Sequence, residues 1–504
     1  MISPGLNGNG LQEAKKGLLS IKCVATSIWS AGETETSDGI MAKLSRGFLR
    51  AIGLAGAAMS LAVAAPALGQ DGGWFPFRLP GLSTGSVAPA APAQSAPATP
   101  APGGSASSDW SGESGASGHP LMTAEAIRAA AANFPSCLEA MWPEAARRGV
   151  PRAVFEAQTA RLTPDLRIMD LLDAQPEFTK AIWDYLDVLV SEDRIQNGRA
   201  ILARHKGVFD TVEKSFGVDR HIVTAIWGVE SNYGTQVGQR PVVRSTATLA
   251  CVGRRQDYFR EEFLSALEII ARGDVDPARL MGSWAGAFGP TQFMPTSFKK
   301  YAIDFDGDGR RDVVDSIPDL IASTANNLKK DGWVSGQTWG YEVVVPEHFN
   351  FMLADRNRVM TMQEWMRAGI TRPLGKAFPR LDDRAYLLVP AGAQGPGFLM
   401  LQNFRVIMRY NPAEAYALAI GYLANRMRGG EPFVQPWPRY ERVLSREERL
   451  ELQQQLASRG YDVGTPDGQL GGKTRAAVRQ FQVAIGSVPD GFATAALLER
   501  LRRP

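Results

Sequence analysis

One carboxylate in the stretch 219–234 has the features of a general acid. The first part of this stretch is predicted to be a helix capped by Asp219, because apolar side chains recur at helical spacing. These apolar positions are Ile222, Ala225, Ile226 and Val229. Glu230 continues the stripe just before the helix stops, so apolar neighbours and the negative end of the helix dipole both penalise its ionised form. We therefore predict a raised pKa for Glu230, as a proton donor requires; a solvated glutamate in the last turn is the alternative.

Residues that other reactions need are missing from the sequence. It contains no His-Glu-x-x-His zinc motif, no Gly-x-Ser-x-Gly elbow and no dinucleotide-type glycine pattern. A net charge of +3 over 504 residues argues against a dedicated nucleic-acid binder. Glycosidic cleavage usually uses two carboxylates, but none accompanies Glu230 in its motif, and the remaining candidates are Asp219, Glu261 and Glu262. A route with a single carboxylate fits better.

Two later stretches supply polar and aromatic groups. Residues 282–295 read Gly-Ser-Trp-Ala-Gly-Ala-Phe-Gly-Pro-Thr-Gln-Phe-Met-Pro. Their glycines suggest a backbone that approaches a ligand closely, with Ser283 and Gln292 beside it, and a glycine-rich turn without a ligand is the alternative. Further on, Arg409-Tyr410-Asn411-Pro412 leads into a predicted helix over 413–426 that contains Tyr416.

An acidic loop has the ligand spacing of an EF-hand. Carboxylates fall at positions 1, 3, 5, 9 and 12 of a twelve-residue loop, and Gly309 is at position 6. The predicted ligand set is Asp304, Asp306, Asp308, Arg310, Asp312 and Asp315. Asp at position 12 has a shorter arm than Glu, which predicts weak affinity or loose selectivity. Carboxylates this close repel each other without a cation, so we expect a structural Ca²⁺ rather than an empty turn, and no cofactor for catalysis.

These motifs together resemble one family. Glu-Ser followed by an aromatic residue and Gly, at 230–234, resembles the catalytic signature of lysozyme-like lytic transglycosylases. With the two later motifs and the acidic loop, the chain resembles the soluble branch of the membrane-bound lytic transglycosylase B family from about residue 120 to about residue 430. In the family's glycine-rich motif Phe288 replaces a Met. A helix tyrosine that often contacts sugar in this family is Asn327 here.

The resemblance implies cleavage of peptidoglycan glycan strands. Protonated Glu230 would donate to the β-1,4 glycosidic oxygen between N-acetylmuramic acid and N-acetylglucosamine, assisted by the muramoyl acetamido group. Glu230 would then take the proton of the sugar's 6-hydroxyl and close a 1,6-anhydro ring. The implied substrate-binding residues are Ser231, Ser283, Gln292, Tyr410, Asn411 and Tyr416, although the tyrosines could be ordinary core aromatics. A hydrolytic muramidase and a noncatalytic peptidoglycan-binding scaffold are the alternatives.

The predicted fold class is α+β and mostly α. A lysozyme-like catalytic domain with a small sheet is expected over 119–428, a linker over 429–442, and a three-helix domain over 443–504. Short strands are predicted at 341–345, 386–389, 398–401 and 404–408. The tail carries Pro-Asp-Gly twice, each time before a helix, and closely resembles C-terminal peptidoglycan-binding modules.

The N-terminal part predicts export. Residues 1–40 are interpreted as an extension from a misassigned start codon, and 41–69 as a signal peptide with a basic start, an apolar run and a small-x-small cleavage site. The Ala/Pro/Ser/Gly-rich stretch 70–118 is expected to be a disordered linker. We expect a periplasmic or secreted protein without stable membrane insertion; retention as an uncleaved anchor is the alternative.

Cysteine usage agrees with an oxidising compartment. Removal of the signal peptide leaves Cys137 and Cys251, an even number. We predict a disulfide that ties the first helices of the catalytic domain to the segment after the Glu230 helix. Two buried thiols are the alternative.

Overall fold

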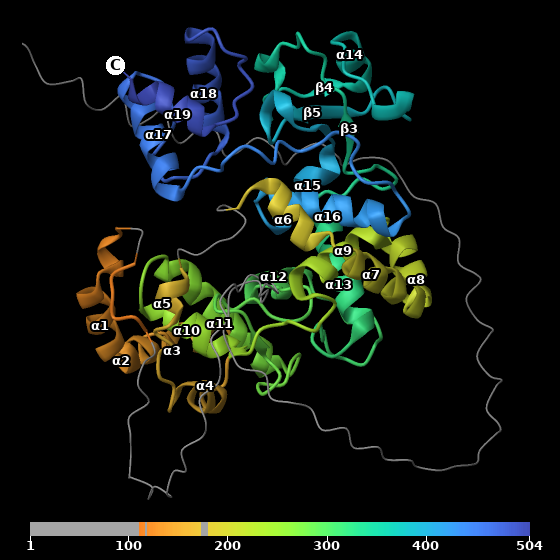
Figure 1. Ribbon diagram of the computed structural model, residues 1–504. Helices are drawn as coiled ribbons and strands as arrows, with labels where there is room; N and C mark the ends of the chain where they lie inside the picture. Colours follow the sequence, from red (N-terminus) through yellow and green to blue (C-terminus); the bar gives the residue numbers. More distant parts are fainter. Residues whose placement is uncertain (1–109, 116–117, 173–179, 504) are drawn as a thin grey trace, which may run out of the picture. The chain divides into compact units, whose positions relative to one another are not determined.

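The computed structural model describes residues 110–115, 118–172 and 180–503 (Figure 1). The predicted extension, the signal peptide and most of the linker lie outside the described residues. Residues 110–115 were expected in that linker but pack on the helices, because the Trp110 ring receives the Arg128 guanidinium at 5.4 Å and Ser111 binds Asp170. None of the helices described has the length and hydropathy to cross a membrane.

Helices form most of the catalytic part, as predicted. Those before the Glu230 helix are α1 (Ala124–Ala132), α2 (Phe134–Glu139), α3 (Trp142–Arg147), α4 (Arg152–Thr159), α5 (Ile168–Leu171), α6 (Ile182–Leu189), α7 (Glu192–Arg204) and α8 (Lys206–Phe216). Those after it are α10 (Val242–Cys251), α11 (Gln256–Arg272), α12 (Pro295–Tyr301), α13 (Ile317–Lys330), α14 (Met362–Arg367), α15 (Gln402–Tyr410) and α16 (Glu414–Met427). Single 3-10 turns are η1 (Pro120–Met122), η3 (Phe351–Leu353), η4 (Pro373–Gly375) and η5 (Gly392–Gln394).

The Glu230 helix, α9 (Arg220–Ser231), lies among other helices. It packs against α7, α13 and α16, and Figure 1 shows it among these helices. Every residue from 222 to 229 is buried. The ends follow the predicted signals: the Asp219 carboxylate accepts from the His221 amide at 2.9 Å, and Asn232 ends the helix in the left-handed conformation.

A small antiparallel sheet has its own core beside the helices. Its strand order is β3 (Gly340–Val343), β6 (Gly397–Met400), β5 (Arg384–Leu388) and β4 (Met360–Thr361). A separate pair consists of β1 (Arg240–Pro241) and β2 (Met281–Gly282). Three predicted strands correspond to β3, β5 and β6. The fourth prediction, at 404–408, is wrong because Phe404 and Ile407 are both buried one helical turn apart in α15.

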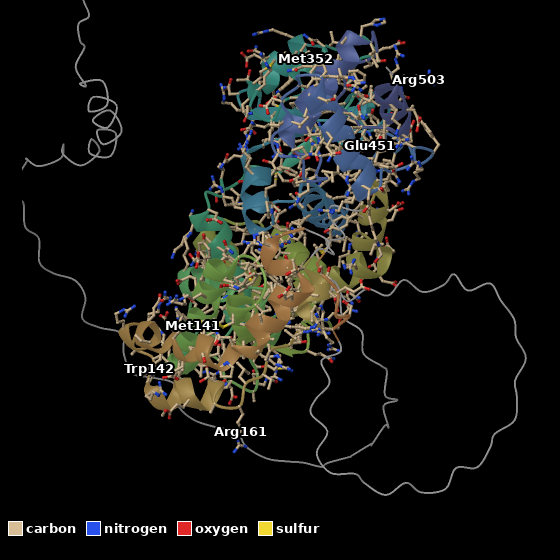
Figure 2. The ribbon with its side chains drawn as sticks, turned by 90° about the vertical axis from the view of Figure 1, so that its left-hand side faces the viewer. Met141, Trp142, Arg161, Met352, Glu451 and Arg503 are labelled. Atoms are coloured by element: carbon tan, nitrogen blue, oxygen red, sulfur yellow. A yellow bond between two sulfur atoms is a disulfide. The ribbon has the colours of Figure 1, made fainter. Side chains whose placement is uncertain are left out.

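The C-terminal module is a three-helix unit, as predicted. It consists of α17 (Arg446–Ser458), α18 (Gly472–Ala484) and α19 (Ala495–Arg502), and Figure 2 labels Glu451 and Arg503 in it. Ser445 and Glu448 form the expected capping box at the start of α17. The module's core is apolar, with Leu452, Leu456, Val478, Leu498 and Leu501 buried.

The predicted linker 429–442 is bound to the catalytic part between Val434 and Arg439. The Glu342 carboxylate accepts from the backbone amides of Val434 and Gln435, at 2.9 and 2.8 Å. Trp437 lies over Phe398, with ring centroids 6.2 Å apart, and Arg439 pairs with Asp187 at 2.7 Å. An aromatic ring and charged partners therefore hold this part of the segment against the catalytic part.

The two cysteines of the catalytic part are joined. The sulfur atoms of Cys137, in α2, and Cys251, at the end of α10, lie 2.00 Å apart, and the bond connects positions 114 residues apart in sequence. Just beyond α2, Trp142, labelled in Figure 2, meets Phe155 edge to face at 5.3 Å. The disulfide thus ties the first helices to the segment that follows α9.

Candidate active site

Glu230 receives a hydrogen bond from a tyrosine on another helix. The Tyr416 hydroxyl, on α16, donates to Glu230 Oε1 at 2.7 Å. Glu230 is partly exposed, whereas Tyr416 is fully buried. Burial and the Glu230 charge raise the pKa of Tyr416 well above its usual value, so its hydroxyl keeps its proton and acts as a donor. The resemblance suggested that Tyr416 contacts sugar; because the side chain is buried, its partner is Glu230 instead.

Tyr410 and Asn411 border the same region from the end of α15. The partly exposed Tyr410 donates its hydroxyl hydrogen bond to the Thr291 carbonyl at 2.6 Å. Its pKa is also raised well above normal by burial and by the charge of Glu230. Asn411 Oδ1 accepts from the Ala413 amide at 3.1 Å, which fixes the turn into α16. These two residues therefore connect the glycine-rich stretch with the helix that carries Tyr416.

The polar side chains of the glycine-rich stretch bind its own backbone. Ser283 Oγ accepts from the Ala287 amide at 3.1 Å, and Gln292 Nε2 donates to the carbonyls of Val237 and Gly289 at 3.1 and 2.9 Å. Gln292 adopts a left-handed φ of 51°. These bonds give both side chains a role in shaping the loop beside Glu230.

The glycines of this stretch are required by contacts within the protein. A Cβ on Gly282 would lie 2.0 Å from the Ala287 carbonyl oxygen, and one on Gly289 would lie 3.0 Å from that of Val313. The sequence suggested a backbone that approaches a ligand. In the structure the loop folds tightly on itself and on its neighbours at these glycines, and the approach to a ligand stays a prediction.

Ser231 does not reach a substrate. It is 1% exposed, and its hydroxyl donates to the Pro290 carbonyl at 2.5 Å and accepts from the Gly234 amide at 2.9 Å. The substrate contact implied for Ser231 is therefore wrong, since the hydroxyl is enclosed by backbone. Its role is to fasten the end of α9 to the loop that contains Gln292.

The candidate second carboxylates are all bound elsewhere. Asp219 is at the opposite end of α9 from Glu230, about 16 Å away at 1.5 Å per residue, and pairs with His221 and Arg428. Glu261 accepts from Arg148 at 2.7 Å. Glu262 is fully buried and accepts from the Thr296 amide and hydroxyl at 2.9 and 2.7 Å, which caps α12. Each of these three therefore has a partner other than Glu230.

Tyr233, the aromatic residue of the Glu-Ser motif, packs against α9. Its ring fills the space beside Gly228, where a Cβ would lie 2.7 Å from the ring. Its hydroxyl donates to the Arg194 carbonyl at 2.7 Å, and burial raises its pKa. Glycine at 228 therefore lets the chain turn back under α9 directly after Glu230.

The acidic loop brings two of the predicted ligands together with a carboxylate that was not predicted. Ligand oxygens of Asp304, Asp306 and Asp319 lie within 4.8 Å of one another. Asp319 is beyond the twelve-residue loop, in the first turn of α13, and was missed because EF-hand spacing ends at position 12.

The other predicted ligands have protein partners. Asp308 accepts from the Arg310 amide at 2.8 Å, and Asp312 from the Val314 and Asp315 amides, both at 2.9 Å. Asp315 accepts from Arg279 Nε at 3.1 Å, which lowers its pKa. Of the six predicted ligands, Asp304 and Asp306 belong to the close carboxylate group and Asp315 is paired with Arg279, while the ligand roles of Asp308, Arg310 and Asp312 stay predictions.

A carboxyl at the end of a buried helix, a tyrosine that holds it and a mostly helical fold define a lysozyme-like class of protein. Two family models match: the transglycosylase SLT domain over residues 133–425 and the peptidoglycan binding domain over residues 445–501. The first covers more than half of the chain, and the chain belongs to this transglycosylase family.

Known relatives agree with this assignment. The membrane-bound lytic murein transglycosylase B of Escherichia coli K12 is 31% identical over 281 residues, which are 53% of this chain and 74% of the relative. The crystal structure of SltB3 from Pseudomonas aeruginosa, in complex with NAG-anhNAM-pentapeptide, is 44% identical with a TM-score of 0.71 and covers 73% of this chain and 99% of its own. Slt35 of Escherichia coli, in complex with calcium, is 28% identical with a TM-score of 0.50, over 59% of this chain and 92% of its own.

Proposed function

We propose that this chain is a lytic transglycosylase that cleaves the MurNAc–GlcNAc β-1,4 bond of peptidoglycan and leaves 1,6-anhydromuramoyl ends. The observation that carries the proposal is the Glu230–Tyr416 hydrogen bond at the end of a buried helix, while the candidate second carboxylates are engaged elsewhere. SltB3, the relative at 44% identity, has been crystallised with NAG-NAM-pentapeptide and with NAG-anhNAM-pentapeptide. These are a peptidoglycan fragment and its anhydro counterpart.

Glu230 acts twice in this reaction. It first gives its proton to the glycosidic oxygen, while the muramoyl acetamido group assists at the anomeric carbon. The resulting carboxylate then takes the proton of the 6-hydroxyl, whose oxygen attacks the same carbon and closes the anhydro ring. The Tyr416 hydroxyl holds one carboxyl oxygen in both steps, which fixes the orientation of the group.

The surrounding residues shape the sugar site. We assign sugar contacts to the partly exposed Tyr410, Asn411 and Gln292. Ser283, which is 8% exposed, holds the loop that presents Gln292. Each of these assignments is tested by substitution with Ala and measurement of KM on glycan fragments.

We infer that the chain works in the cell envelope, exported by residues 41–69 to the periplasm or beyond. Its substrate is found there, and a disulfide between Cys137 and Cys251 is expected of an oxidising compartment. The N-terminal sequence of the mature protein tests the cleavage after residue 69.

We also infer a structural cation, with Ca²⁺ as the candidate, at Asp304, Asp306 and Asp319. Carboxylate oxygens are the ligands that Ca²⁺ prefers, and Slt35 was crystallised with calcium. Asp319 is fully buried, which raises its pKa, although amides of Phe305 and Asp312 donate to it at 2.7 and 2.8 Å. A cation would offset the cost of grouping three carboxylates there.

The test of the reaction is mass spectrometry of the soluble products from purified peptidoglycan. The mature chain should release anhydromuramoyl ends, and Glu230→Gln should bind the wall but lose cleavage by several orders of magnitude. Glu261→Gln, a glutamate on the surface of α11, is the matched control and should cleave normally. Reducing ends would indicate a hydrolase, and binding without release by the parent chain would indicate a scaffold.

A further inference from the structure

A buried carboxylate connects the C-terminal module to the catalytic part. Glu414, the first residue of α16, is 9% exposed. Its Oε2 accepts from Nη1 of Arg475, in α18 of the module, at 2.6 Å. Its Oε1 accepts from Nη2 of Arg356, in the segment between η3 and β4. One side chain thus joins three parts of the fold.

The same helical turn carries Tyr416. Residues two apart on a helix project to nearly opposite sides, so Glu414 meets the module while Tyr416 meets Glu230. The turn before them is fixed by Asn411, which accepts from the Ala413 amide. The position of this first turn therefore affects both the docking contact and the donor to the catalytic carboxyl.

The ion pairs are charged under ordinary conditions. Burial raises the pKa of Glu414, but the charges of Arg475 and Arg356 and their hydrogen bonds outweigh it and lower the pKa below the usual value. Arg479, also in α18, lies 3.7 Å from Asp355 at the same junction. A carboxylate between two arginines is a strong, directional contact because both of its oxygens are used.

The side chains around these ion pairs are not closely packed. Two cavities, of about 310 and about 470 Å³, are both lined by Arg356, Glu414 and Arg475. The ion pairs therefore lie between two cavities and connect the module to the catalytic part across them. A second docking point is Asp490, which accepts from the Ala393 amide at 2.9 Å.

From this arrangement we propose that Glu414 and the module's Arg475 are positioning residues of the transglycosylase reaction. The module, besides holding the wall, fixes the first turn of α16 and so aligns the Tyr416 hydroxyl with Glu230. Loss of Arg475 leaves the turn attached on one side, and the hydrogen bond to Glu230 loosens. This inference rests on the proposed function, since it concerns the alignment of that carboxyl.

The test uses the full mature chain and a soluble GlcNAc–MurNAc glycan fragment as substrate. Arg475→Ala is expected to lower kcat roughly tenfold with little change in KM, because it disturbs alignment rather than binding. Arg475→Lys should recover part of the rate, since lysine keeps the positive charge of arginine. Lys473→Ala, on the same helix but paired with Asp462 at 3.0 Å within the module, is the matched control and should leave kcat unchanged.

A double-mutant cycle separates alignment from general stability. If Arg475 acts through Tyr416, Arg475→Ala should lower kcat much less in the Tyr416→Phe background than in the parent chain. Glu414→Gln provides a second variant if Arg475→Ala folds poorly. An unchanged kcat for Arg475→Ala, or fully additive losses in the cycle, would overturn the inference and leave the module as a tether. Absence of anhydro products from the parent chain would instead contradict the proposed function.

Discussion

The Tyr416 hydroxyl and the Glu230 carboxyl, 186 positions apart in sequence, are joined by a 2.7 Å hydrogen bond between α16 and α9. Both helices are among the most buried in the protein, so neither side chain can move without the helix that carries it. The bond fixes the orientation of a group that must deliver a proton and then receive one. It also makes Tyr416, rather than a second carboxylate, the identified partner of Glu230.

Replacing Tyr416 with Phe should slow cleavage roughly ten- to a hundredfold, since a hydrogen bond to a charged group is worth about 1.5–3 kcal/mol. The substitution keeps the ring and its packing, so wall binding and the melting temperature should change little. The measurement is the rate of anhydromuramoyl release. Tyr422→Phe, six residues further along α16, should behave like the parent chain; an equal loss in both variants would contradict the role given to Tyr416.

Ser231→Ala should destabilise the protein and reduce activity together. It leaves the Pro290 carbonyl and the Gly234 amide without their partner in a buried place, at a cost of about 1–3 kcal/mol. Urea denaturation measures the free energy of unfolding, and product release measures the activity. Ser215→Ala, on the exposed side of α8, is the control. A stable variant with normal cleavage would show that the hydrogen bonds of Ser231 are not needed for stability or activity.

Calcium should raise the melting temperature of the parent chain, and EDTA should lower it. Asp306→Asn combined with Asp319→Asn should abolish the response, because both belong to the close carboxylate group. Asp315→Asn should keep the response, since Asp315 pairs with Arg279. The opposite pattern would restore the twelve-residue EF-hand ligand set, and no response in the parent chain would remove the cation from the proposal.

Replacing both Cys137 and Cys251 with Ser should lower the free energy of unfolding by about 2–4 kcal/mol. The bond closes a loop with a sequence separation of 114, and opening it increases the conformational freedom of the unfolded chain. Denaturation of the parent chain with and without a reductant should show the same difference. In the double variant the reductant should have no effect, and a thiol titration of the parent chain that finds two free thiols would exclude the bond.

Acidification should weaken the contact between Glu414 and Arg475. A carboxyl whose pKa is lower in the folded than in the unfolded state stabilises the fold above its unfolded pKa, and this contribution is lost as the pH falls through the folded value. The loss therefore begins below the ordinary glutamate pKa of 4.5. Urea denaturation at several pH values between neutral and acid measures the free energy of unfolding. This free energy should fall less on acidification for Glu414→Gln than for the parent chain, while the exposed Glu431→Gln should behave like the parent chain.

The sequence by itself identified the features that depend on neighbouring residues. The Asp219 cap, the apolar periodicity of α9 and the residues that stop it located Glu230 at a helix end. The Ser445 capping box and the glycine turns located the three helices of the module. Such signals act within one or two helical turns, so they are present in the sequence before any tertiary contact forms.

Only the tertiary structure decided which of the motif residues face each other. Tyr416 turned out to hold Glu230, Ser231 to bind Pro290, and Asp319 to lie beside Asp304 and Asp306 of the acidic loop. The short apolar run at 404–408 fits a strand and a helix equally well until neighbouring elements bury one face of it. These outcomes depend on contacts between segments far apart in the chain, which spacing along the sequence does not encode.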